Sequence, residues 1–313
     1  MKKDLISIAD FSREELCRFF ELAARLKKQR REGVTHHLLP GRVLAMIFEK
    51  PSLRTRVTFE TGIFDLGGTG IYLGPSDIGL GKRESVKDTA ENLERWVHVI
   101  MARTFSHQSV VELGANCRIP VINALTDLLH PCQVLADLLT VIEHFNLDPA
   151  APDFSGINFA FISDGNNVAN SWINAASVLG FDFTMSCPEG YDPDPAVWAA
   201  AQERGAAVRL VRDPREAARG IKVIYTDTWA SMGQEAEAEE RRKVFMPYQV
   251  NAELIELADP EVKVLHCQPA HREWEITSEV MDGPHSIVMD EAENRLHIQK
   301  AVMVLLSQAA GTA

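Results

Sequence analysis

Two arginines and two hydroxyl residues lie within five positions of one another, in the segment Ser52-Leu53-Arg54-Thr55-Arg56. Guanidinium groups and hydroxyls bind phosphate oxygens well, because they offer several hydrogen-bond donors and, in arginine, a permanent charge. The segment follows the apolar run Val43–Phe48 and precedes a helical spacing of apolar residues. Because the free N–H groups of a helix start also favour an anion, the segment predicts a phosphate site. The alternative is a solvated helix start that Ser52 merely caps.

Other polar residues follow apolar runs at the points where strands would end. Each has an ordinary structural interpretation: an ion pair for Arg103, a helix start for His130, a helix cap for Asn166 or Asn167, and a small buried side chain for Cys267. Their shared position is more informative, because ligands gather at the carboxyl ends of parallel strands. We therefore expect one active site that includes Arg103, His130, Gln133, the segment 164–167, Asp227 and Cys267.

The elements that would position these residues alternate between strand and helix. Short apolar runs predict strands at 43–48, 71–73, 97–102, 121–123, 157–162, 183–185, 208–211, 223–226, 262–266 and 287–289. Capping signals and apolar spacing predict helices at 12–31, after Ser52, after Ser85, from Pro131, and at 168–179, 195–204, 234–245 and 291–308. This alternation predicts an α/β fold of two doubly wound parallel-sheet domains, with ligands at the carboxyl ends of the strands.

Length and composition favour a two-domain globular protein. The 313 residues exceed what one hydrophobic core usually supports, and the linker-like segment 148–153 suggests the boundary. We expect domains at 1–148 and 149–290, with a C-terminal helix at about 291–313 packing back on the first domain.

Charge and cysteine usage exclude several classes of protein. A net charge of −12 argues against broad binding of nucleic acid or of an anionic membrane. The five cysteines form no CxxC pair, which predicts neither a disulfide framework nor a zinc site. No apolar run is long enough for a membrane span, and no signal sequence follows Met1. We therefore expect a cytoplasmic protein without a metal site.

The motifs together resemble one enzyme family, the aspartate and ornithine carbamoyltransferases. Ser52-Leu53-Arg54-Thr55-Arg56 is similar to the family's Ser-x-Arg-Thr-Arg signature, and His130-Pro131-Cys132-Gln133 to its His-Pro-x-Gln motif. Three segments resemble the ornithine branch, and Ala292-Glu293-Asn294-Arg295 resembles the last arginine motif. Those three are Asp164-Gly165-Asn166-Asn167, Asp227-Thr228-Trp229-Ala230-Ser231-Met232-Gly233 and His266-Cys267-Gln268-Pro269-Ala270. The resemblance covers nearly the whole chain, in order.

The resemblance implies a transferase that moves the carbamoyl group of carbamoyl phosphate to the δ-amine of L-ornithine, giving L-citrulline and phosphate. This is a step of arginine biosynthesis or of a urea-cycle-type pathway. The first domain would bind carbamoyl phosphate and the second ornithine, with the active site in the cleft between them. The family needs no metal or other cofactor, since phosphate is already an activated leaving group. The resemblance also implies a homotrimer or a multiple of trimers.

The resemblance further assigns roles to individual residues. Carbamoyl phosphate would be bound by Ser52, Leu53, Arg54, Thr55, Arg103, His130, Gln133, Cys267, Gln268 and Arg295. Ornithine would be bound by Asn167, Asp227, Ser231 and Met232. The residues expected to act in catalysis are Arg54, Arg103, His130, Asp227 and Cys267.

Two departures from the family pattern keep alternatives open. Gln268 replaces the usual Leu of the ornithine branch, so a modified ornithine or putrescine is an alternative amine. Gly79 stands where many relatives have a Gln that reaches a neighbouring subunit's carbamoyl phosphate, which puts that shared contact in doubt. A non-catalytic paralogue that binds carbamoyl phosphate is an alternative from another class. A nicotinamide dehydrogenase is disfavoured, because no Gly-x-Gly-x-x-Gly follows the first strand of either half.

Overall fold

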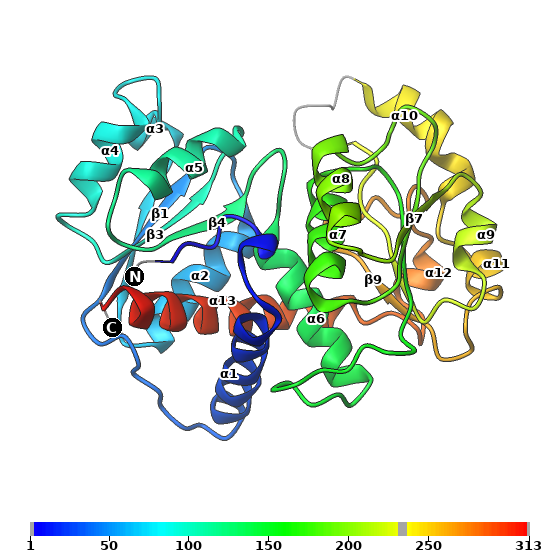
Figure 1. Ribbon diagram of the computed structural model, residues 1–313, viewed down its shortest axis with the longest axis horizontal. Coiled ribbons are helices and arrows are strands. Elements are labelled where there is room, and N and C mark those ends of the chain that lie inside the picture. The colour runs from blue at the N-terminus through cyan, green and yellow to red at the C-terminus, as the bar shows by residue number, and fades with distance from the viewer. Residues whose placement is uncertain (1–2, 231–236, 312–313) are drawn as a thin grey trace. The chain divides into compact units, whose positions relative to one another are not determined.

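The protein is described by a computed structural model that covers residues 3–230 and 237–311. It divides into two compact units (Figure 1). Unit 1 comprises Met1–Pro152 with Glu293–Ala313, and unit 2 comprises Asp153–Ala292. Each unit contains a parallel β-sheet with helices around it, so the predicted α/β class and the two parallel sheets are confirmed.

The sheet of unit 1 has four parallel strands in the order β2-β1-β3-β4. Its strands are β1 (Val43–Phe48), β2 (Thr69–Leu73), β3 (Val99–Arg103) and β4 (Val121–Leu125). The two central strands, β1 and β3, are almost wholly buried, because their apolar runs are covered on both faces. The edge strand β2 is partly exposed.

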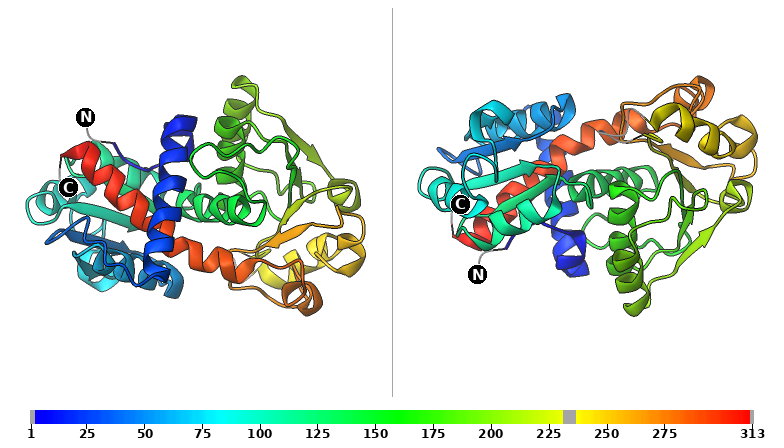
Figure 2. Two further views of the ribbon diagram at one scale, coloured as in Figure 1. Left: turned by 90° about the horizontal axis from the view of Figure 1, so that it is seen from below. Right: turned by 90° about the horizontal axis from the view of Figure 1, so that it is seen from above.

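Within its described residues, unit 1 contains the short 3-10 helix Ile8–Asp10 and seven α-helices. They are α1 (Arg13–Arg31), α2 (Leu53–Asp65), α3 (Pro75–Ile78), α4 (Val86–Leu93), α5 (His107–Ala115), α6 (Pro131–His144) and most of α13 (Val288–Ala310). The predicted capping box is present at the start of α1, where Ser12 and Glu15 each accept a hydrogen bond from the other's backbone N–H. In both views of Figure 2, α1 lies across α13, and Lys27 of α1 donates to Asn294 of α13 at 2.8 Å.

The sheet of unit 2 has five parallel strands in the order β7-β6-β5-β8-β9. Its strands are β5 (Phe159–Ile162), β6 (Phe183–Ser186), β7 (Val208–Val211), β8 (Val223–Tyr225) and β9 (Lys263–Leu265). Its helices are α7 (Asn167–Leu179), α8 (Pro195–Glu203), α9 (Pro214–Ala218), α10 (Ala238–Phe245), α11 (Ala252–Ile255) and α12 (Ser278–Met281). Trp172 of α7 packs on Phe159 and Phe183, which anchors this helix to the sheet.

One strand prediction is wrong. The segment 287–289 is not a strand, because α13 already begins at Val288. Ile287 donates a single hydrogen bond to Val264 of β9 at 3.0 Å, and the carbonyl of Ile287 then accepts from Glu291 as the helix starts. The predicted helix at 234–245 is observed as α10 from Ala238, while 234–236 lie outside the described residues.

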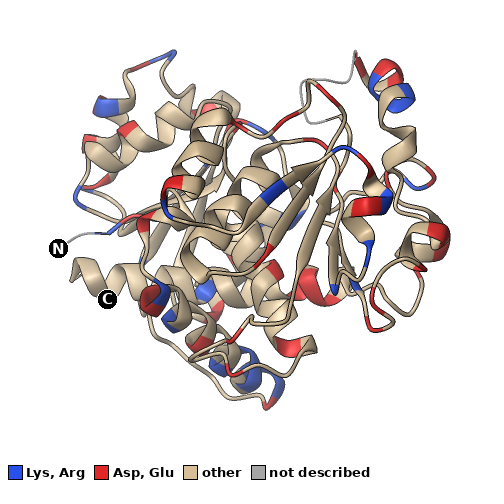
Figure 3. Cartoon of the chain, turned by 45° about the vertical axis from the view of Figure 1, so that its right-hand side comes forward, with Lys and Arg blue, Asp and Glu red and all other residues tan. Residues whose placement is uncertain are grey.

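Within the described ranges, no helix is both long and apolar enough to cross a membrane. In the view of Figure 3, lysines and arginines are scattered among the more numerous acidic residues on both units.

In each sheet the chain connections run toward one edge from one central strand and toward the opposite edge from its neighbour, and we call the position between these two strands the reversal point. In unit 1 the reversal falls between β1 and β3, and in unit 2 it falls between β5 and β8. Loops that leave neighbouring strands at such a point run in opposite directions and open a crevice at the carboxyl ends, where ligands of α/β proteins bind. The phosphate segment and Arg103 follow β1 and β3, while Asp164 and Asp227 follow β5 and β8.

Candidate active site

The phosphate segment and Arg103 lie side by side at the reversal point of unit 1. Phe48 and Arg103 are register partners in β1 and β3, and the Glu49 N–H donates to the Arg103 carbonyl at 2.9 Å. Ser52 caps α2, since its Oγ accepts from the Thr55 N–H at 3.3 Å. The capping interpretation of Ser52 is therefore correct, and it is compatible with a phosphate site, because the remaining N–H groups of the helix start stay available.

The side chains of this segment differ in their exposure. Thr55 is fully buried, Arg54 is half-buried, and the Leu53 side chain is 76% exposed, which leaves only its backbone for a ligand. Arg56 lies on the exposed face of α2, where it pairs with Glu60 at 3.4 Å and stacks on Tyr72. Of the two arginines, only Arg54 therefore lies on the protected side with Thr55.

Arg295 connects three of the predicted residues. Its Nη1 donates to Gln133 Oε1 at 2.9 Å, and its Nη2 donates to Thr55 Oγ1 at 2.8 Å. The guanidinium is buried, so α13 contributes a desolvated positive charge between α2 and α6. Gln133 in turn donates from Nε2 to Asp137 Oδ1 at 2.8 Å.

His130 lies immediately before α6, whose first residue is Pro131 as predicted. The imidazole is buried, and burial holds the pKa of His130 well below its usual value, with further lowering by the positive charges of Arg295 and Arg103. His130 is therefore neutral at physiological pH and can donate from one ring nitrogen without carrying a charge. The two arginines that lower this pKa also make the site attractive to a phosphate dianion.

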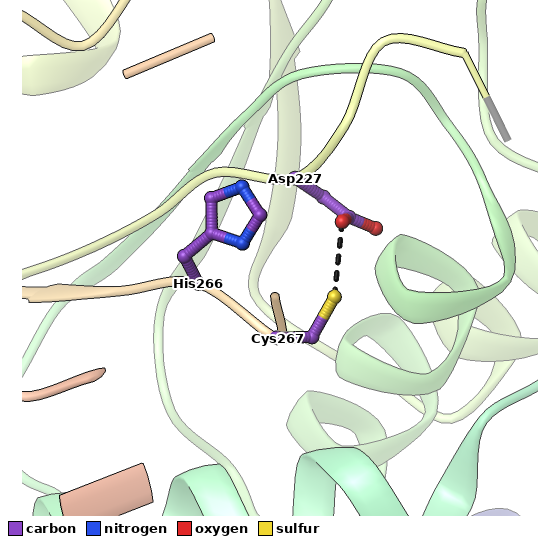
Figure 4. A group of neighbouring side chains, drawn as sticks. All are labelled: Asp227, His266 and Cys267. Atoms are coloured by element: carbon purple, nitrogen blue, oxygen red, sulfur yellow. Dashed lines mark hydrogen bonds between the residues drawn. The ribbon is translucent and has the colours of Figure 1, made fainter. Parts of the chain in front are cut away.

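In unit 2, Asp227 follows β8 and is held by several donors. Its Oδ2 accepts from Asn166 Nδ2 at 2.7 Å, and its Oδ1 accepts from the Cys267 thiol at 3.0 Å and from the Thr228 N–H at 2.8 Å. Figure 4 shows the Asp227 carboxylate and the Cys267 thiol facing each other. The side chain of Asp227 is only 3% exposed, so unit 2 presents a buried carboxylate at its reversal point.

Sequence reasoning assigned ornithine binding to Asn167 in this region and named Asn166 only as a possible helix cap. Asn166 caps α7, because its Oδ1 accepts from the N–H groups of Val168 and Ala169 at 2.9 and 3.1 Å. This arrangement directs its amide nitrogen to Asp227. Asn167 is the first residue of α7 and is half-buried. The capping signal was visible in the sequence, but it did not show which amide contacts Asp227.

A second acidic residue lies near Asp227. Burial raises the pKa of Asp164 to about 6, although the Arg241 guanidinium opposes this shift, and the Asp227 carboxylate adds to it. Arg241 forms an ion pair with Asp164 and also donates to the Trp229 carbonyl. This contact links α10 to the segment that follows Asp227.

The turn after β9 presents Cys267 and Gln268. Gln268 has a positive φ of 57°, and its N–H donates to His266 Nδ1 at 2.8 Å. Its side-chain nitrogen contacts the Met289 sulfur at 3.9 Å. The remaining predicted residues of unit 2, Ser231 and Met232, lie outside the described residues.

Asp227, His266 and Cys267 are the one group of potential metal ligands found within the described ranges (Figure 4). Their ligand atoms lie within 4.8 Å of one another. However, both ring nitrogens of His266 are engaged, because Nδ1 accepts from Gln268 and Nε2 lies 3.1 Å from a Glu275 oxygen. The three residues therefore form part of a hydrogen-bond network, and a metal would have to displace these bonds.

Comparisons with known proteins agree with this division into two halves. Residues 3–143 match the family model of the aspartate/ornithine carbamoyltransferase carbamoyl-P binding domain. Residues 155–306 match the model of the Asp/Orn binding domain of the same family.

Individual relatives match over nearly their whole length. The chain is 50% identical over 306 residues to the ornithine carbamoyltransferase of Syntrophotalea carbinolica, covering 98% of this chain and 99% of the relative. It is also 50% identical to that of Archaeoglobus fulgidus over 304 residues, covering 97% of each. The solved structure of ornithine carbamoyltransferase from Pyrococcus furiosus is similar, with a TM-score of 0.91 and 47% identity over 97% of this chain and 96% of that chain.

Proposed function

This chain belongs to the aspartate/ornithine carbamoyltransferase family, and we propose that it transfers the carbamoyl group of carbamoyl phosphate to the δ-amine of L-ornithine, giving L-citrulline and phosphate. The buried carboxylate of Asp227, at the reversal point of unit 2, is the observation that supports ornithine as the amine substrate. A buried anion favours a cationic partner, and ornithine offers ammonium groups. Aspartate would instead require additional cationic groups for its second carboxylate.

Carbamoyl phosphate is proposed to bind to unit 1. The phosphate dianion would be held by Arg54, by the hydroxyls of Ser52 and Thr55, and by the N–H groups at the start of α2, including that of Leu53. Arg103, in register with the end of β1, would contact both the phosphate and the carbonyl oxygen. The buried positive charge of Arg295 supports this assignment, because Arg295 is bonded directly to Thr55.

Stabilisation of the transition state is proposed to come from groups around the carbonyl carbon. Attack on this carbon places negative charge on the carbonyl oxygen, and the neutral His130, Thr55 and Arg103 are the donors proposed for it. The carbamoyl NH₂ group needs acceptors, which Gln133 and the backbone carbonyls of Cys267 and Gln268 would supply.

The amine is proposed to bind to unit 2. Asp227 would pair with the α-ammonium of ornithine, while Asn167, Ser231 and Met232 would hold its α-amino acid end. The δ-nitrogen must lose a proton before it attacks, since an alkylammonium has a pKa of about 10.4 in water. The new N–C bond forms first and gives a tetrahedral intermediate, whose collapse breaks the C–O bond so that phosphate leaves with the electron pair. The attacking nitrogen loses its extra proton to the departing phosphate, which leaves a neutral citrulline side-chain nitrogen. Asp227 and Cys267 are the residues proposed to lie nearest to this nitrogen.

The proposal includes a homotrimer, or a multiple of trimers, acting in the cytoplasm in arginine biosynthesis or a urea-cycle-type step. An association is supported by exposed apolar residues on one face of α2 in unit 1. Leu53, Val57 and Phe64 share this face by their helical spacing and are 76%, 50% and 75% exposed. Exposed apolar faces of this kind mark interaction sites. A reducing compartment is supported by five cysteines in the free form.

The proposal is tested by a citrulline-type assay in which ornithine, N-acetylornithine, putrescine and aspartate are offered side by side with carbamoyl phosphate. We expect ornithine to be carbamoylated fastest. Preference for putrescine or a modified ornithine would implicate Gln268 in amine selection. A protein that binds carbamoyl phosphate but carbamoylates none of the four amines would overturn the proposed activity.

A further inference from the structure

A carboxylate without a role in the proposed reaction is buried beside the carbamoyl-phosphate residues. Asp137 lies on α6 one turn after Gln133, and both side chains are almost fully buried. Gln133 Nε2 donates to Asp137 Oδ1 at 2.8 Å. Burying a carboxylate is costly unless it is hydrogen-bonded and compensated, so its position beside Gln133 calls for an explanation.

The contacts of Gln133 determine which way its amide points. A carboxylate only accepts hydrogen bonds and a guanidinium only donates them, whereas an amide has one end of each kind. The nitrogen of Gln133 must therefore face Asp137, and its oxygen must face Arg295, where Nη1 donates at 2.9 Å. A rotated amide would place its NH₂ against the guanidinium and its oxygen against the carboxylate, losing both hydrogen bonds.

The oriented oxygen lies beside the phosphate segment, because the same Arg295 guanidinium also donates to Thr55 at 2.8 Å. An amide oxygen can accept more than one hydrogen bond. Beside the Arg295 guanidinium, a planar NH₂ group can therefore donate to it, and a carbamoyl group has such an NH₂ whereas an acetyl group lacks it.

We propose that Asp137 is a positioning residue that holds the amide oxygen of Gln133 toward the carbamoyl NH₂ group and thereby makes the site select carbamoyl over acyl phosphates. The inference rests on the proposed function, in that it takes carbamoyl phosphate as the ligand of unit 1. Asp137 acts through Gln133 and does not itself touch the ligand.

The test is a calorimetric titration with two stable phosphonates of the same shape, phosphonoacetamide and 2-oxopropylphosphonate. They differ only in carrying NH₂ or CH₃ on the carbonyl carbon, so the ratio of their affinities reports on recognition of the NH₂ group. We expect the parent protein to favour the amide by about tenfold, as one buried hydrogen bond allows. In Asp137→Leu the Gln133 nitrogen loses its acceptor and the amide is held at one end only, by Arg295, so the ratio should fall to within about threefold of unity.

A charge-conserving exchange provides the rescue. In the double variant Gln133→Glu with Asp137→Asn, the Glu carboxylate accepts from both Arg295 and the Asn nitrogen, which restores an acceptor toward the ligand. We expect the ratio to return to within about threefold of the parent value, while Gln133→Glu alone, with two adjacent carboxylates, remains defective. Thr140→Val is the matched control, because Thr140 lies one turn further along α6 and bonds to Ala136 and Asn294. It should change stability and leave the ratio unchanged.

The affinity ratio distinguishes a change in the orientation of the Gln133 amide from a general loss of folding or charge balance. Such a general loss would weaken the binding of both phosphonates equally. A parent protein that binds the two equally, an unchanged ratio in Asp137→Leu, or a double variant no better than Gln133→Glu would each overturn the role of Asp137. The titration needs no amine substrate, so failure of the protein to form citrulline would contradict the proposed function without affecting this result.

Discussion

The thiol of Cys267 donates to the carboxylate of Asp227 at 3.0 Å, joining the carboxyl ends of the paired strands β8 and β9. Asn166 reaches the other oxygen of the same carboxylate from the end of β5. Three separate segments of unit 2 therefore converge on one buried anion. This convergence holds the carboxylate in a fixed orientation before any substrate arrives, which is the condition for effective pairing with a bound ammonium.

Replacement of Asp227 by Asn removes this charge and keeps the shape of the side chain. We predict that kcat/KM for ornithine falls by at least about thirtyfold, because an ammonium that binds without its buried partner loses about 2 kcal/mol or more. Affinity for carbamoyl phosphate, which is assigned to unit 1, should change little. Steady-state kinetics with each substrate varied in turn measures both effects.

N-acetylornithine is the control substrate for Asp227→Asn, since its α-nitrogen carries no charge. The parent protein should use it poorly, and the substitution should reduce that activity much less than the activity with ornithine. If the parent protein prefers N-acetylornithine or putrescine, the assignments of Asp227 and of the substrate are both wrong.

The phosphate segment offers two arginines that differ in their surroundings. Arg54 is half-buried next to Thr55, whereas Arg56 is exposed and already pairs with Glu60. We predict that Arg54→Lys lowers the rate at subsaturating carbamoyl phosphate by at least about tenfold, or about 1.4 kcal/mol, because a lysine cannot replace the forked contact of a guanidinium. Arg56→Lys is the matched control and should stay within about twofold of the parent. Similar rates for both variants would argue against a phosphate contact by Arg54.

Stability should depend on pH through His130. Burial and the neighbouring arginines depress its pKa in the folded protein from the ordinary value of 6.5, so below that pH the unfolded chain binds more protons at this position than the folded protein does. The stability associated with neutral His130 is therefore fully present above pH 6.5 and is lost as the pH falls toward the lower folded pKa. We predict that the parent protein loses more unfolding free energy between about pH 8 and about pH 5 than His130→Gln does.

Urea denaturation of the parent and of His130→Gln at a series of pH values measures this difference. Other histidines with lowered pKa, such as His297, contribute equally to both proteins and cancel in the comparison. Parallel stability curves for the two proteins would show that His130 titrates normally in the folded state.

Much of the fold could be predicted because its signals are local. The apolar run Val43–Phe48 lies between Gly41 and Pro51, and β1 begins and ends at the same two residues as the run. The wrong strand prediction at 287–289 also came from a local signal, because the two β-branched residues Ile287 and Val288 are typical of a strand. In the structure Val288 is the first residue of α13. Three residues are too few to distinguish the two-residue period of a strand from the 3.6-residue period of a helix.

The candidate site could be predicted only in part, because its decisive contacts are between distant segments. Arg295 reaches Gln133 across 162 positions of the sequence, and nothing local to α6 indicates that Gln133 must be held from both ends. Asp137 occupies an apolar helix and has no motif of its own, so its contact with Gln133 became visible only in three dimensions.

Gly165 allows the turn after β5, which carries Asn166, to pass close to the backbone of Asp192 and Pro193. A Cβ atom at Gly165 would lie 2.3 Å from the backbone of both Asp192 and Pro193, a distance that no side-chain rotation can relieve. We predict that Gly165→Ala displaces this turn and lowers the free energy of unfolding by about 1 to 3 kcal/mol. It should weaken the binding of ornithine more than the binding of carbamoyl phosphate. Gly180→Ala, at the other end of α7, is the control: φ there is 73° with open space around it, so about 1 kcal/mol of backbone strain is expected without loss of ornithine affinity. Equal effects of the two variants on the KM for ornithine would show that the close approach at Gly165 is not what positions Asn166.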